Sequence, residues 1–260
     1  MTIKVTTKTI RQLKGKRPIV ALTAYDSITA NLASEAGVDL ILIGDSVGTT
    51  LLGFDSTTSV TLEMIVHHTA AVARSNPKSL IVSDVPFIEA SFSTDKILRS
   101  CQKIMQRGNA NAVKIEGGKT IAPKIAELVL AGIPVLGHIG LLPQHYHVLG
   151  GYKSFGKTPK EETQLLEDAK ALEDAGCFSI VCEMVKPEIT AKIAKSIDIP
   201  LIGIGSGNGC DGQILVSTDI LGMDPSSKPK FAHQYANVGE ITKDAFKQYV
   251  AAVLENKSTS

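Results

Sequence analysis

The sequence predicts an α/β protein built as a (β/α)8 barrel (TIM barrel), a single domain over residues 1–260 with a short N-terminal helix or arm. Two observations predict this fold. Eight short apolar runs alternate, for the most part, with segments of helical period. Five of these runs end on a residue that can ligate a metal or move a proton. The alternative, an open doubly wound sheet, concentrates such residues at one switch point, so the barrel is favoured.

Local signals mark the ends of several strands and helices. Gly37 and Gly108 are expected to end helices, and Thr61 can cap one. Pro86 stops the third strand, and Pro187 opens a helix. The expected strands are apolar runs at 18–23, 39–46, 80–84, 112–116, 133–138, 178–183, 199–204 and 213–217. After an arm or helix at 8–15, the expected helices lie at 28–36, 61–73, 94–107, 120–131, 162–175, 187–196 and 240–255.

Two long segments without a period follow strands on the expected active face. Residues 47–60 are rich in glycine and threonine, and residues 139–158 are rich in glycine and aromatic side chains. Loops of this length in compact domains are often functional, so we predict that 139–158 is a mobile lid. Residues 224–239 are expected to be irregular, and 257–260 to fray.

Composition argues against several classes of protein. The net charge is +1 with no block of like charge, which disfavours nucleic acid or an anionic membrane as the main partner. No apolar run reaches the roughly 18 residues of a membrane span, and the N-terminus has no apolar signal-peptide centre. The four cysteines form no C-x-x-C pair, so neither a zinc knuckle nor a redox dithiol is indicated. Reduced, buried thiols are expected, which is consistent with the cytoplasm.

Three carboxylates end three successive strands, and they predict a metal site. Asp45, Asp84 and Glu116 are hard oxygen donors of the kind that Mg²⁺ prefers. The alternative is that they pair with Lys114 and nearby arginines. Lys114 lies two residues from Glu116 on the same strand, so the two side chains are expected to share a face. A substrate that carries a carboxylate or an oxyanion would suit this cation beside a metal.

Glu183 ends the strand two places further on and is the candidate general base. A carboxylate at an otherwise apolar strand end can have a raised proton affinity. Together these residues predict abstraction of a proton next to a metal-bound carbonyl, which gives an enolate. His138 ends the intervening strand, and its role stays open at this point.

Seven short motifs carry a family resemblance. They are, in order, Gly44-Asp-Ser-Val-Gly48, Asp84-Val-Pro86, Val113-Lys-Ile-Glu-Gly-Gly118, Gly137-His-Ile-Gly-Leu141, Gly150-Gly-Tyr152, Ile202-Gly-Ile-Gly-Ser-Gly-Asn208 and Asp211-Gly-Gln213. With these motifs the chain, from about residue 8 to 255, resembles the ketopantoate hydroxymethyltransferase family. Ser206 stands where that family usually has alanine, a change expected to be harmless.

The resemblance implies a reaction and the residues for it. The family transfers a one-carbon unit from 5,10-methylenetetrahydrofolate to 3-methyl-2-oxobutanoate by way of a Mg-bound enolate. The product, 2-dehydropantoate (ketopantoate), enters pantothenate and coenzyme A synthesis. By this likeness Asp45, Asp84 and Glu116 would hold Mg²⁺. The keto acid would be bound by Asp45, Ser46, Asp84 and Lys114, and Glu183 would take the C3 proton.

The resemblance also implies a homo-oligomer, commonly a decamer, and folate binding rests on it alone. Three other functions stay open on the sequence. One is a Mg-dependent carbon–carbon lyase or mutase of the phosphoenolpyruvate mutase/isocitrate lyase type. Another is a non-catalytic keto-acid binding protein. The third is a phosphate-binding barrel, because Gly203-Ile-Gly-Ser-Gly207 is similar to loops that cradle phosphate.

Overall fold

The structure is a computed structural model that describes residues 4–226 and 229–255. The chain divides into two compact units at residues 214 and 215, and each is described by itself. The first unit holds the barrel and all the candidate site residues. The expectation of a single domain over 1–260 stays a prediction.

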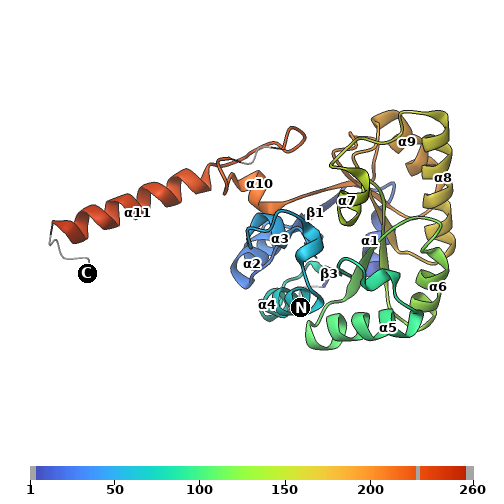
Figure 1. Cartoon of the computed structure of the whole chain (residues 1–260), viewed down its shortest axis with the longest axis horizontal. Helices are drawn as coiled ribbons and strands as arrows, with labels where there is room; N and C mark the ends of the chain where they lie inside the picture. Colours follow the sequence, from blue (N-terminus) through green and yellow to red (C-terminus); the bar gives the residue numbers. More distant parts are fainter. Residues whose placement is uncertain (1–3, 227–228, 256–260) are drawn as a thin grey trace. The chain divides into compact units, whose positions relative to one another are not determined.

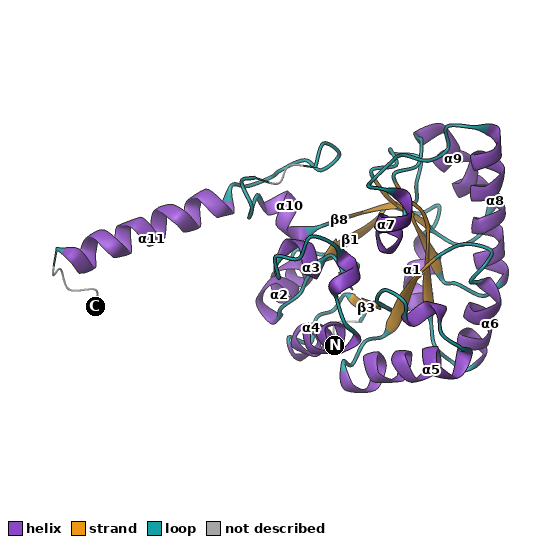
Figure 2. Cartoon of the chain, in the orientation of Figure 1, coloured by secondary structure: helices purple, strands orange, loops and turns teal. Residues whose placement is uncertain are grey.

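The described residues of the first unit form a closed barrel, in which the strands follow one another in sequence order. All the strand pairs for which a register is given are parallel. The predicted (β/α)8 barrel is therefore confirmed (Figures 1 and 2). The strands are β1 (Ile19–Thr23), β2 (Leu40–Ile43), β3 (Leu80–Asp84), β4 (Ala112–Glu116), β5 (Val135–Gly140), β6 (Ser179–Glu183), β7 (Leu201–Ile204) and β8 (Gly212–Leu215).

Helices surround the strands, as Figure 2 shows. They form where apolar residues recur at helical spacing, so that one face packs on the sheet. Thr61 caps α4 as expected, because its hydroxyl accepts a hydrogen bond from the Met64 amide. β7 is followed by β8 with no helix between them. The barrel helices are α2 (Ser27–Glu35), α4 (Leu62–Arg74), α5 (Thr94–Gln102), α6 (Ala122–Leu130), α8 (Pro159–Asp174) and α9 (Pro187–Ser196).

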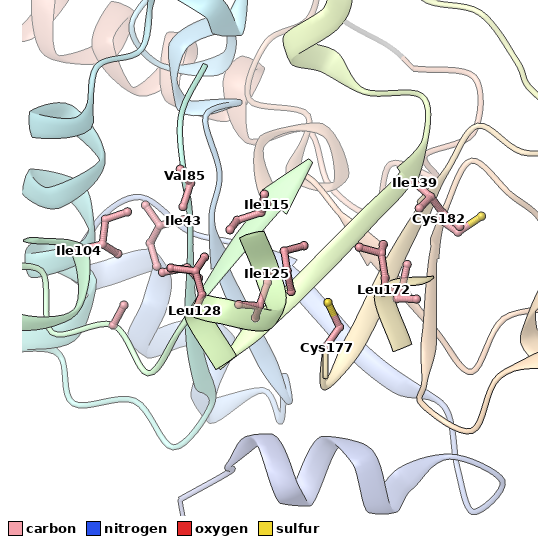
Figure 3. Packing of buried hydrophobic residues seen from close by; sticks show 14 of the residues in the cluster. Ile43, Val85, Ile104, Ile115, Ile125, Leu128, Ile139, Leu172, Cys177 and Cys182 are labelled. Carbon is pink, nitrogen blue, oxygen red and sulfur yellow. The ribbon is translucent and has the colours of Figure 1, made fainter. Parts of the chain in front are cut away.

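The hydrophobic core lies largely between the strands and these helices. Figure 3 shows part of it, with Ile115 of β4 near Ile125 and Leu128 of α6. Successive strand residues point to opposite faces, so Lys114 and Glu116, on either side of Ile115, point into the barrel. The shared face that the sequence predicted for these two residues is confirmed by their ion-pair distance below.

An N-terminal helix precedes the barrel, and a partly exposed ion pair, with the Arg17 side chain 51% exposed and the Asp39 side chain buried, lies beside β1. α1 (Thr7–Leu13) is the predicted N-terminal helix, and Thr6 and Thr9 form its capping box. Arg17 donates two hydrogen bonds to the buried Asp39 carboxylate, which also accepts from the Val20 amide. Burial raises the pKa of Asp39, but the bonds from Arg17 outweigh it and lower the pKa overall. The carboxylate thus ties β1 to the start of β2.

Several boundaries differ from the sequence-based expectation. The second strand ends at Ile43 rather than at 46, because residues 47–50 turn at once into α3 (Val47–Thr50). Segment 47–60 also contains a 3₁₀ turn at Thr57–Ser59, so it is not wholly irregular. The helix expected at 94–107 is α5 followed by a π turn at Lys103–Arg107. The eighth strand lies at Gly212–Leu215 rather than at 213–217.

The second unit consists of a short helix and a long one. α10 (Ser217–Leu221) and α11 (Val238–Leu254) are joined by a connection that is irregular over its described residues, as expected. α11 matches the helix predicted at 240–255. The predicted fraying of 257–260 lies outside the described residues. In the part of the chain that the structure describes, no helix is both long and apolar enough to span a membrane.

Candidate active site

The three predicted carboxylates meet at the carboxyl ends of neighbouring strands. Asp84 and Glu116 are the last residues of β3 and β4, and Asp45 follows β2 by two residues. All three are buried. The backbone amide of Asp45 donates a hydrogen bond to Asp84 Oδ2 at 2.9 Å. This bond fixes the Asp84 side chain relative to the backbone of Asp45. Three buried carboxylates at adjacent strand ends need compensating positive charge.

Lys114 supplies part of that charge. Its Nζ lies 2.6 Å from Asp84 Oδ1 and 3.8 Å from Glu116 Oε1. Burial alone would lower the pKa of Lys114, but Asp84, Glu116 and Asp45 raise it, so the ammonium is retained. The pKa of Asp45 is raised well above its usual value by burial, and then by the charges of Asp84 and Glu116. Lys114 therefore faces three buried carboxylates with one positive charge, and His138 contributes to the charge balance at Glu116, whose pKa is lowered despite its burial.

His138 joins Glu116 to Glu183. Its Nδ1 lies 3.5 Å from Glu116 Oε1, and its Nε2 lies 3.3 Å from Glu183 Oε2. The β4–β5 register places Glu116 directly beside His138, which explains the first contact. Burial lowers the pKa of His138, but Glu116 and Glu183 raise it to about 9. The two carboxylates therefore favour the protonated imidazole, which lies between the carboxylate cluster and the candidate base, although neither ring nitrogen makes a hydrogen bond at these distances.

Glu183 ends β6 and is the most accessible carboxylate of this group. Its side chain is 16% exposed, against 3% for Glu116. Gly140 is its neighbour on β5, and a side chain at this glycine would put its Cβ 2.3 Å from the Glu183 carbonyl oxygen. Gly140 also has a φ of +89°, which favours glycine. The backbone of β5 thus lies close to the backbone of Glu183 and fixes the position of the end of β6, which carries the candidate base.

Ser46 is held by a tyrosine that the sequence analysis did not identify as functional. The Tyr25 hydroxyl lies 2.7 Å from Ser46 Oγ, and the Tyr25 ring is buried. Burial raises the pKa of Tyr25, so the phenol stays protonated. His68 Nδ1 lies 2.8 Å from the Tyr25 carbonyl oxygen. Tyr25 follows β1 by two residues, as Asp45 follows β2, so the same strand-end pattern could have found it.

Gln144 is a second residue that the sequence analysis missed. It lies in a 3₁₀ turn, Pro143–His145, inside the segment 139–158. Its side-chain amide donates to Asp45 Oδ2 at 2.9 Å and to the Val85 carbonyl at 3.0 Å. Its backbone amide donates to Glu116 Oε2 at 3.1 Å. No periodic signal marks this position, because it lies in a loop.

The donor set fits a hard divalent cation. Glu116 Oε1 is buried and makes no hydrogen bond, and the Asp45 and Asp84 carboxylates lie at the ends of the two neighbouring strands. Carboxylate oxygens of this kind are the ligands that Mg²⁺ prefers. Among the described residues, no three His, Cys, Asp or Glu side chains are already arranged as metal ligands. These residues therefore fit a hard cation by the type of their donor atoms. Substrate and water would complete the coordination of the ion.

Comparisons with known proteins identify the family. A family profile described as "Ketopantoate hydroxymethyltransferase" matches residues 4–258. The chain belongs to the ketopantoate hydroxymethyltransferase family. A 3-methyl-2-oxobutanoate hydroxymethyltransferase of Pseudothermotoga lettingae is 49% identical over 247 residues, which cover 95% of this chain and 93% of the relative.

Solved structures of lower identity support the fold of this ketopantoate hydroxymethyltransferase family member. A phosphonopyruvate hydrolase, in a complex with oxalate and Mg²⁺, has a TM-score of 0.63 at 13% identity, over 96% of this chain and 88% of that chain. A 2,3-dimethylmalate lyase of the PEP mutase/isocitrate lyase superfamily has a TM-score of 0.60 at 15% identity, over 95% and 86%. At sequence identities of 13% and 15%, these similarities support the barrel fold and nothing about function.

The structure accommodates Ser206, where the family resemblance leads us to expect alanine. Ser206 is fully buried, and its hydroxyl accepts a hydrogen bond from the Val185 amide at 3.0 Å. The same oxygen lies 2.8 Å from the Cys182 carbonyl. The hydroxyl is thus satisfied by backbone groups on both sides of Glu183. It faces the backbone of the β6 end.

Proposed function

We propose that the chain transfers a hydroxymethyl unit from 5,10-methylenetetrahydrofolate to 3-methyl-2-oxobutanoate and gives 2-dehydropantoate, within pantothenate and coenzyme A synthesis. Family membership supports the reaction. The observation that carries the mechanism is that His138 lies between a carboxylate cluster and a separate carboxylate, Glu183, at 3.5 Å from Glu116 Oε1 and 3.3 Å from Glu183 Oε2. The cluster offers a place for the keto acid, and Glu183 offers a proton acceptor.

The residues of the cluster would bind and orient the keto acid. Asp45, Asp84 and Glu116 would hold Mg²⁺, which supplies Lewis-acid polarisation of the keto carbonyl when it is bound. Lys114 is the buried cation that would face the substrate carboxylate or the developing oxyanion. Ser46 would donate its hydroxyl proton to the keto acid while its own oxygen accepts from Tyr25. We propose this substrate-binding role for Asp45, Ser46, Asp84 and Lys114.

Glu183 would remove the proton from C3 of the keto acid. The electron pair left on C3 would form the new bond to the folate methylene carbon, and both carbon–nitrogen bonds of that carbon would break. Water would supply the hydroxyl group, and the C3 proton and the remaining water proton would go to the two folate nitrogens. His138 would orient Glu183, because its Nε2 lies 3.3 Å from Glu183 Oε2. A positioned general base of this kind contributes about 10²–10⁴-fold to the rate.

Proton exchange at C3 tests this proposal. The keto acid is incubated in heavy water with the protein, with and without Mg²⁺ and tetrahydrofolate, and loss of the C3 proton is followed by NMR. Exchange that needs Mg²⁺, together with formation of 2-dehydropantoate from methylenetetrahydrofolate, is expected. Turnover of oxaloacetate or isocitrate without one-carbon transfer would instead select the lyase reaction. Binding without exchange would select a non-catalytic protein.

Two further properties belong to the same proposal. The family resemblance supports a homo-oligomer, commonly a decamer. The net charge of +1, with no block of like charge, supports the proposal that neither nucleic acid nor a membrane is a main partner. The cytoplasm is proposed from the free cysteines, of which Cys101, Cys177 and Cys182 are buried and Cys210 is partly exposed. Light scattering of the purified protein tests the assembly.

A further inference from the structure

We propose that Gln144 is a positioning residue that orients Asp45 for the metal ion and thereby couples metal binding to closure of the segment 139–158. The inference deepens the proposed function, because it rests on the metal site placed at Asp45, Asp84 and Glu116. It concerns a residue that itself contacts neither metal nor substrate. Three hydrogen bonds from this one residue carry it.

The orientation of the Gln144 amide is determined by its partners. Asp45 Oδ2 and the Val85 carbonyl oxygen both accept hydrogen bonds and lie 2.9 and 3.0 Å from Gln144 Nε2. An amide turned the other way would place its oxygen against two acceptors and lose both bonds. Gln144 is buried, so those losses would not be made good by water. The NH₂ group therefore points at Asp45.

Two of the three hydrogen bonds from Gln144 go to carboxylates, and each of them engages one of the two carboxylate oxygens. The Gln144 side chain occupies Asp45 Oδ2, and its backbone amide occupies Glu116 Oε2. Glu116 Oε1 makes no hydrogen bond, and its ion-pair partners His138 Nδ1 and Lys114 Nζ lie 3.5 and 3.8 Å away. This is the arrangement in which outer groups orient metal ligands, and loss of such a group typically costs 10–100-fold in metal affinity. Gln144 does this for Asp45 through its side chain.

The position of Gln144 in the chain couples the site to the loop. Both ends of the segment are tied to the end of β6, because the Leu141 amide donates to the Glu183 carbonyl and the Phe155 amide donates to the Met184 carbonyl. Between these anchors, Gln144 provides the bonds to the carboxylates. If the closed loop strengthens metal binding, then bound metal must stabilise the closed loop by the same free energy.

The test compares Mg²⁺ binding and loop protection in the full-length protein without keto acid or folate. Gln144→Met keeps the length of the side chain and removes its donors, and Gln144→Ala is the second variant. Both keep the backbone amide that binds Glu116. Calorimetry is expected to give Mg²⁺ affinity about 10–100-fold weaker in both variants. Gln102→Met, at an exposed position on α5, is the matched control and should bind as the wild type does.

Hydrogen exchange of residues 142–154 provides the second measurement. In the wild type, Mg²⁺ should slow exchange in this segment, and in the Gln144 variants it should slow exchange less at equal metal occupancy. If Gln144 had only a structural role, its variants would have a lower melting temperature without metal. Mg²⁺ would then slow hydrogen exchange equally in the variants and in the wild type. Wild-type Mg²⁺ affinity in either folded variant would overturn the inference. A wild-type protein that binds no Mg²⁺ would instead overturn the metal site of the proposed function.

Discussion

Replacing Glu183 by glutamine separates catalysis from binding. The substitution keeps the shape of the side chain and removes the proton acceptor. Asp45, Asp84 and Glu116 follow other strands, so the metal ligands should stay in place. The closest charged partner is His138, whose Nε2 lies 3.3 Å from Glu183 Oε2. The pKa of His138 should fall in the variant, because Glu183 is one of the two carboxylates that raise it.

The expected loss of C3 proton exchange follows from the proposed role of Glu183 as the general base. Exchange of the C3 proton into heavy water should fall by a factor of about 10²–10⁴, the usual contribution of a positioned general base. Affinity for the keto acid in the presence of Mg²⁺ should change little, because the contacts proposed for binding do not use Glu183. A fall in exchange with intact binding marks a group that acts in the transition state.

NMR of the C3 proton gives the exchange rate, and calorimetry gives the affinity. Glu188→Gln is the matched control, since Glu188 is exposed in the first turn of α9, five residues away in the sequence. The control should exchange the proton at the wild-type rate. If Glu183→Gln also exchanges it at that rate, the base assignment is wrong, and His138 becomes the next candidate.

Three further results are expected. Asp45→Ala and Asp84→Ala should each abolish Mg²⁺-dependent binding of the keto acid, and unchanged Mg²⁺ affinity by calorimetry would refute the ligand assignment. Proteolytic cleavage within 139–158 should slow when keto acid and folate are both present, whereas equal rates would rule out a lid. The free energy of unfolding should fall as the pH falls through the lowered pKa of Asp39, because protonation breaks the pair with Arg17. Asp39→Asn should remove that component, cost about 1–3 kcal/mol at neutral pH and leave keto-acid binding unchanged, as urea unfolding and calorimetry can measure.

Much of the barrel could be predicted from the sequence, because its signals are local. Apolar runs of strand length and helical spacing of apolar residues reflect which faces must be buried, and they placed most elements within a few residues. The same pattern identified Asp45, Asp84 and Glu116, since the carboxyl ends of parallel strands meet at one edge. Strand alternation predicted that Lys114 would share their face. The family motifs then supplied the reaction, which no spacing could have shown.

The tertiary structure decided what these residues touch. Gln144 is 99 residues from Asp45 in the sequence, and Tyr25 is 21 residues from Ser46. Neither pairing has a periodic signal. The short helices within 47–60 were missed for a related reason, because four residues are too few to show a period. The protonated form of His138 is favoured only because folding placed a carboxylate beside each ring nitrogen. Such contacts depend on the register of strands and the path of loops, and these are set by packing of the whole barrel.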